Sequence, residues 1–150
     1  MLIAEMAATS KLAGRTLADE MDALYAQYGC FAAGQTNVVF TSDEQKAACM
    51  ALLDALRAAP PKTLADWPVT SVTDFRAGLE TDTATGTQTP TGLPRENMLR
   101  LTLGEHGTVI LRPSGTEPKI KFYYATRADS MEKAQGMIES LEEAMTAMLK

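Results

Sequence analysis

Three short segments with alternating apolar and polar residues dominate the C-terminal half of the sequence, and they constrain the fold most strongly. They cover residues 98–103, 108–111 and 119–126, and each has the length and composition of a β-strand. The four residues between the first two segments begin and end with glycine, which predicts a tight hairpin turn. We therefore expect an antiparallel sheet with one face buried and the other in water.

Helical periodicity flanks this group of strands on both sides. Apolar residues recur at helical spacing over residues 43–56, and the spacing of Thr41 and Glu44 predicts a capping box at the start of that helix. A second helix is expected over residues 131–149, capped by one of the two polar residues that precede it. Strands that lie between two helices in the sequence predict an α+β fold, an antiparallel sheet flanked by helices on one side.

Residues 1–40 are expected to lie outside this fold. They contain two helical segments, the second capped by Thr16 and ended by Gly29, and a short extended stretch over residues 37–40. A single strand is too little for an independent domain, so we assign residues 41–150 to the α+β domain. The apolar stripes of the two N-terminal helices then have no partner, which predicts weak anchoring of this part.

Residues 76–95 are rich in threonine and glycine and lack large apolar residues at alternating positions. Alternating threonines are compatible with an edge strand, but nothing in the segment would anchor such a strand to a core. We expect a mobile loop with a short strand at its end, because structureless segments of this length are functional or disordered when they occur.

The composition of the 150 residues excludes several classes of function. The net charge of −5 argues against binding to nucleic acids or to anionic membranes, and no apolar run is long enough to span a bilayer. The first residues make a poor signal peptide. Cys30 and Cys49, the only cysteines, cannot form a disulfide framework or a four-cysteine metal site. A cytoplasmic protein is expected.

The segment between the last two strands has the residue types that bind a phosphate group. It reads Arg-Pro-Ser-Gly-Thr-Glu-Pro over residues 112–118. Arg112 offers a planar set of donors that matches two phosphate oxygens, and Ser114 and Thr116 offer hydroxyl groups. Gly115 allows backbone N–H groups to approach an anion, and Lys121 supplies a further positive charge.

A purely structural explanation of this segment remains open at this point. Serine, glycine and threonine are common turn residues, and the chain would then be a non-catalytic interaction domain. Arg112 before the turn and Lys121 after it favour the phosphate site. His106 lies in the glycine-flanked hairpin turn, where we expect an exposed residue and not a catalytic one. No catalytic residue and no metal ligand is predicted in this chain.

The twelve residues RPSGTEPKIKFY, at positions 112–123, resemble the phosphate-binding loop in the last domain of the α-D-phosphohexomutases. Their EPKIK part is similar to the phosphoglucomutase and phosphopentomutase branch. Shorter segments at 2–6, 14–17, 28–29, 93–94 and 97–99 resemble the same family. The resemblance implies that residues 1–40 are the helical end of the family's third domain, an α/β domain. Residues 41–150 would be its fourth domain, which has a TBP-like fold.

Enzymes of this family interconvert the 1-phosphate and the primary-hydroxyl phosphate of a sugar. They use a phosphoserine in the first domain, a Mg²⁺ ion in the second and a bisphosphorylated sugar intermediate. By the resemblance, Arg112, Ser114, Gly115, Thr116 and Lys121 would hold the phosphate that is not reacting; Lys121 stands where several relatives carry arginine. The serine loop, the metal-binding aspartates and the sugar-recognition segment are not found in this sequence. The chain is therefore expected to be a fragment, inactive alone, whose partners are a phosphosugar and the N-terminal domains of the same protein.

Overall fold

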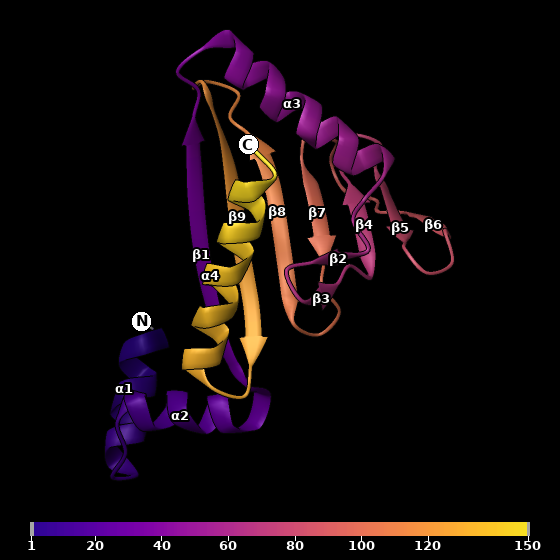
Figure 1. The fold of residues 1–150 in the computed structure, drawn as a ribbon. Coiled ribbons are helices and arrows are strands. Elements are labelled where there is room, and N and C mark those ends of the chain that lie inside the picture. The colour runs from indigo at the N-terminus through magenta and orange to yellow at the C-terminus, as the bar shows by residue number, and fades with distance from the viewer. Residues whose placement is uncertain (1, 150) are drawn as a thin grey trace.

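A seven-stranded sheet organises the computed structural model, which describes residues 2–149 (Figure 1). Its strands are β1 (Cys30–Val39), β4 (Ser71–Asp74), β5 (Leu79–Asp82), β6 (Gln88–Pro90), β7 (Leu99–Thr102), β8 (Gly107–Pro113) and β9 (Lys119–Ala128). Their order across the sheet is β1-β9-β8-β7-β4-β5-β6, and every neighbouring pair is antiparallel. Two very short strands, β2 (Thr63–Leu64) and β3 (Trp67–Pro68), form a separate ribbon.

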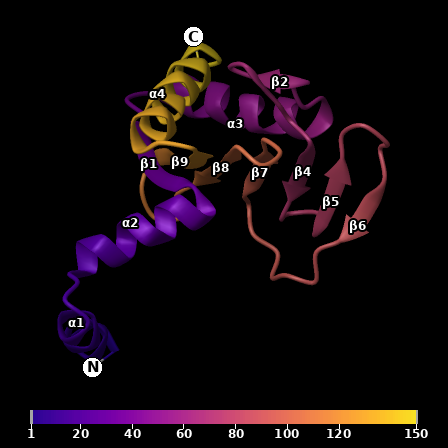
Figure 2. The ribbon, with the colours of Figure 1, turned by 90° about the horizontal axis from the view of Figure 1, so that it is seen from below.

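Four helices complete the fold of residues 2–149. They are α1 (Leu2–Leu12), α2 (Leu17–Tyr28), α3 (Asp43–Ala58) and α4 (Met131–Ala147). Helices α3 and α4 cover one face of the sheet, whereas α1 and α2 extend away from the N-terminal end of β1 (Figures 1 and 2). The expected α+β fold, an antiparallel sheet with helices on one face, is confirmed. None of the helices formed by residues 2–149 is long and apolar enough to cross a membrane.

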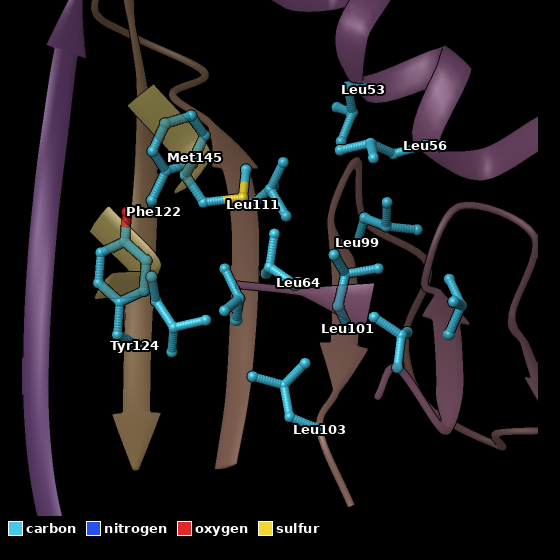
Figure 3. Packing of buried hydrophobic residues seen from close by; sticks show 14 of the residues in the cluster. Leu53, Leu56, Leu64, Leu99, Leu101, Leu103, Leu111, Phe122, Tyr124 and Met145 are labelled. Atoms are coloured by element: carbon cyan, nitrogen blue, oxygen red, sulfur yellow. The ribbon is translucent and has the colours of Figure 1, made fainter. Parts of the chain in front are cut away.

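The core lies between the sheet and the helices α3 and α4. Strands β7, β8 and β9 turn every second side chain toward the helices, as the predicted alternation requires. Figure 3 shows the resulting cluster of leucine, phenylalanine, tyrosine and methionine side chains. Its fully buried members include Leu53, Leu64, Leu99, Leu101, Leu111, Phe122 and Met145. Burying each of these large side chains stabilises the fold by about 1.5–3 kcal/mol.

Gly34 allows α4 to pack closely on β1. A Cβ atom at this position would lie 2.7 Å from Cγ2 of Ile138, well inside van der Waals contact. The side chain of Ile138 occupies the space that any other residue at position 34 would need. Glycine is thus required here by packing and not by the backbone conformation.

The short extended stretch expected over residues 37–40 is in fact the C-terminal part of β1. This strand pairs with β9 along ten residues, from Cys30 opposite Ala128 to Val39 opposite Lys119. The sheet therefore begins at residue 30 and not after residue 40. Periodicity missed the strand because its residues are mostly small or polar, and the pairing with the long strand β9 determines its conformation. The assignment of the preceding helices to a neighbouring domain stays a prediction.

The threonine-rich segment is more ordered than expected. Most of it forms the hairpin of β5 and β6 at the edge of the sheet, so the prediction of a mobile loop was wrong for these residues. Asp82 stabilises the turn because its carboxylate accepts hydrogen bonds from the backbone N–H groups of Ala84 and Thr85 and from the Thr85 hydroxyl. Backbone pairing and this local cap replace the apolar anchors that the sequence lacks.

The helix caps agree with the sequence except at one position. Thr16 caps α2 as predicted, and Ser130 caps α4. For α3 the cap is Ser42, one residue after the predicted Thr41, and its hydroxyl accepts from the Gln45 N–H at 3.3 Å. Gln45 returns a contact to Thr41, whose N–H donates to the amide oxygen at 2.8 Å. Two adjacent hydroxyl residues made the position ambiguous by one.

Candidate functional site

The candidate site lies where β8 and β9 are joined by the five residues 114–118. Ser114 donates its N–H to the Lys119 carbonyl at 2.9 Å, which closes the base of this loop. At its far end, the Pro118 carbonyl accepts from the Phe40 N–H at 2.8 Å. The loop is therefore fixed on one side by the hairpin and on the other by the connection between β1 and α3.

Strand pairing brings the two predicted cations together. Arg112 of β8 lies directly opposite Lys121 of β9, and Asn37 of β1 lies on the other side of Lys121. Their neighbours Leu111 and Phe122 are fully buried toward the helices, so Arg112 and Lys121 point to the uncovered face, hereafter the open face. Like charges directly opposite each other in a sheet repel, and a bound anion would relieve that repulsion.

The loop and the open face form a pocket of about 390 Å³. This volume is within the range of small-molecule sites. Its lining includes all five residues predicted to bind phosphate and three that were not predicted to bind: Arg112, Pro113, Ser114, Gly115, Thr116, Glu117, Lys121 and Tyr123. The structure thus brings every predicted site residue to one concave surface.

Carboxylates neutralise two of the cations around the pocket. Glu96 Oε2 lies 3.2 Å from Arg112 Nη2, and Glu117 Oε2 lies 2.7 Å from Lys119 Nζ. The hydrogen bond from Lys119, then its charge and the charge of Lys121, hold the pKa of Glu117 below its ordinary value. Lys121 forms no ion pair with any residue of the described chain, 2–149. Lys121 can therefore bind an anion without first breaking an ion pair with a carboxylate.

In the Ser-Gly-Thr turn, the serine hydroxyl stabilises the turn, whereas two backbone donors have no acceptor within residues 2–149. Ser114 Oγ accepts from the Glu117 N–H at 3.3 Å, so this hydroxyl holds the turn, as the structural explanation requires. The backbone N–H groups of Gly115 and Thr116 donate to no acceptor within residues 2–149. Two adjacent free N–H groups beside the pocket are available to an anion.

Gly115 has no structural reason to be glycine. Its backbone does not adopt a positive φ, and an added Cβ would meet no heavy atom within 4 Å. Neither conformation nor packing therefore excludes a side chain at this position. Close approach of a ligand to the backbone is a reason that remains.

The side chains described for residues 2–149 do not fit a metal site. No group of three or more His, Cys, Asp and Glu side chains within residues 2–149 is arranged to hold a metal ion. The Mg²⁺ that the resemblance implies has no set of ligands among these residues. His106 is exposed in the turn at the opposite end of β8. Cys30 and Cys49 are free and buried, and burial raises the pKa of the Cys49 thiol.

Sequence reasoning missed Glu96 and Tyr123 as neighbours of the site. Tyr123 lies on the same face of β9 as Lys121, but it was given no role from the sequence. Glu96 lies three residues before β7, and the register that pairs Leu99 with Leu111 brings this stretch beside the end of β8. The predicted hairpin of β7 and β8 therefore contained the signal for Glu96, because extending its register leads to the loop.

Comparison with known proteins yields one matching family model. The model of the phosphoglucomutase/phosphomannomutase C-terminal domain matches residues 42–144. A phosphoglucomutase of Staphylococcus haemolyticus is 32% identical over 132 residues, which cover 88% of this chain and 24% of that protein. A phosphoglucomutase of Staphylococcus epidermidis is 31% identical over 128 residues, 85% of this chain and 23% of that protein.

A phosphoglucomutase of Staphylococcus aureus is 28% identical over 140 residues, 93% of this chain and 25% of that protein. The present chain thus spans about a quarter of the length of these curated relatives.

Proposed function

The chain belongs to the phosphoglucomutase/phosphomannomutase family, whose C-terminal domain it carries, and from this premise we propose that its β8–β9 loop anchors the phosphate of a phosphosugar. The observation that carries the proposal is the pairing of Arg112 with Lys121 beside the free N–H groups of Gly115 and Thr116. Positive charge and unused donors converge there on a pocket in a protein that is negative as a whole.

Each group has a defined part in the proposed contact. Arg112 binds two phosphate oxygens with its planar guanidinium, after its contact with Glu96 is released. The N–H groups of Gly115 and Thr116 and the Thr116 hydroxyl bind the remaining oxygens. Lys121 adds a charge without bidentate geometry, so its share of the binding is smaller. Ser114 mainly keeps the turn in shape through its bond to the Glu117 N–H.

We propose further that this domain acts within a phosphosugar mutase, an isomerase that interconverts sugar 1-phosphate and sugar 6-phosphate, or pentose 1- and 5-phosphate. A phosphoserine on another domain of the same protein would exchange its phosphoryl group with a sugar bisphosphate, with Mg²⁺ as the metal cofactor. The pocket described here would hold the phosphate at the unreactive end of the sugar. The names of the relatives and the matched family support this wider role.

Titration with inorganic phosphate, followed by NMR of backbone amides, tests the anchor. In the unchanged chain, the signals of Gly115 and Thr116 should shift with increasing phosphate. Arg112→Ala should weaken binding by about tenfold or more, because hydrogen bonds to charged groups contribute about 1.5–3 kcal/mol each. Arg76→Ala is the matched control, since the Arg76 side chain is 57% exposed, against 52% for Arg112, and is also ion-paired, with Asp54.

If the loop signals do not move at tens of millimolar phosphate, the turn is only structural, and the chain is better described as an interaction domain. Equal losses in Arg112→Ala and Arg76→Ala would also contradict the proposal, because they would indicate a general effect of net charge.

A further inference from the structure

Strand β1 exposes a long unpaired edge. It is the end strand of the sheet, and β9 is its only strand partner within residues 2–149. Phe40 directs its N–H toward the β9 side, where it donates to the Pro118 carbonyl. Because successive residues of a strand direct their backbone groups to opposite sides, the odd-numbered residues of β1 direct theirs outward. These residues are Phe31, Ala33, Gln35, Asn37 and Val39, and none of their backbone groups has a partner within residues 2–149.

The two edges of the sheet differ in how they are protected against pairing. At the opposite edge, β6 has only three residues, all exposed and polar or proline, and it ends in Pro90. Such short, proline-containing edges resist the addition of another strand. In contrast, β1 has ten residues, without a charge and without a proline. An uncharged edge of this length is a template for a further strand.

We propose that β1 pairs with β1 of a second copy of this chain, antiparallel, about a two-fold axis at Gln35. Outward-facing residues must lie opposite outward-facing residues, which restricts the register to odd-numbered pairs. With Gln35 opposite its own copy, Ala33 lies opposite Asn37 and Phe31 lies opposite Val39. This register pairs all five outward-facing residues, and each of the five pairs exchanges two backbone hydrogen bonds.

The side chains of β1 fit this register. Phe31 and Val39 are 55% and 58% exposed and are the large apolar residues of the strand that remain in water. In the proposed dimer, Phe31 of each copy lies beside Val39 of the other copy. Such aromatic and β-branched cross-strand neighbours stabilise a sheet. Because β1 contains no charged residue, the two paired strands bring no like charges together, although each copy carries a net charge of −5. A second copy is therefore a self-complementary occupant of this edge.

Helix α2 marks one end of the proposed interface. Helix α2 lies at the N-terminal end of β1 (Figure 1), and its residues Met21 and Leu24 are 44% and 46% exposed. Antiparallel pairing brings the C-terminal end of the other β1, with Val39, to this end of the strand. Helix α2 therefore lies close to the end of the proposed interface, where Phe31 pairs with Val39 of the other copy.

The mass of the full chain in solution, measured by sedimentation across the micromolar range, tests the dimer. It should double with increasing concentration. Gln35→Lys and Gln35→Glu place like charges on the axis, and each should weaken dimerisation at least about tenfold. An equal mixture of the two variants should restore the dimer as a mixed pair. Thr89→Lys puts the same charge on the β6 edge and should leave the dimer unchanged.

Amide hydrogen exchange gives a second measurement, with a residue pattern that is specific to pairing of a further strand with the β1 edge. The N–H groups of the odd-numbered residues of β1 should become protected as the concentration rises, whereas the even-numbered ones should be protected throughout. Far-UV circular dichroism confirms that each variant is folded. A monomer at all concentrations overturns the proposal. So does a dimer that survives both Gln35 substitutions, or one that is lost only in Met6→Asp, which would locate the contact on α1.

Discussion

Replacing Glu96 with glutamine should strengthen phosphate binding, because Glu96 occupies the guanidinium that the phosphate needs. The contact of Glu96 with Arg112 measures 3.2 Å, and both side chains are about half exposed, 50% and 52%. Glutamine keeps the size of the side chain and removes its charge. The substitution therefore releases Arg112 without creating a cavity.

The size of the effect follows from the exposure of the pair. Exposed ion pairs stabilise by about 0.2–1 kcal/mol, and tenfold in affinity corresponds to about 1.4 kcal/mol. We thus expect phosphate affinity to rise by between about 1.4-fold and about fivefold in Glu96→Gln. The advantage should shrink at high salt, because the screening length falls from about 10 Å at 0.1 M to about 3 Å at 1 M.

The measurement is the same amide titration with inorganic phosphate, at low and at high ionic strength. Glu105→Gln is the matched control, since Glu105 is exposed in the turn at the other end of β8 and changes the net charge equally. An affinity in Glu96→Gln that is unchanged or lower, or an equal gain in Glu105→Gln, would refute the idea that Glu96 competes with phosphate.

Three further substitutions test other parts of the structure. Gly115→Ala should leave the free energy of unfolding within about 0.5 kcal/mol, yet weaken phosphate binding about tenfold by blocking one backbone donor; urea unfolding and titration measure both. Gly34→Ala should destabilise by about 1–3 kcal/mol in urea unfolding, because its methyl group meets Ile138. Lys119→Met should return the pKa of Glu117 toward its usual 4.5 in an NMR pH titration, because the variant lacks the hydrogen bond and the charge that favour the carboxylate in the folded state. In the unchanged chain this stabilisation is present above the usual pKa and is lost as the pH falls through the lowered pKa.

The parts of the fold that could be predicted from the sequence are the helices and strands whose conformation is determined by their own apolar side chains. Strands β7, β8 and β9 and helix α4 carry large apolar residues at regular spacing, and these residues form the core. Strand β1 lacks such residues, so its conformation depends on a partner distant in the sequence. The same distinction holds at the site. Arg112 and Lys121 were found from residue type, whereas Glu96 reaches the site only through the register of the hairpin.

The pairing of β1 with β9 also has a consequence for the order of folding. Ala32 and Thr126 face each other although they are 94 residues apart in the chain, whereas the five-residue loop between β8 and β9 closes locally. Closing the longer loop costs roughly 2–3 kcal/mol more in chain entropy. Strands β7, β8 and β9 can therefore associate early with α4, and β1 joins last. Changes in β1, such as those at Gly34, should then mainly accelerate unfolding and leave the folding rate almost unaltered.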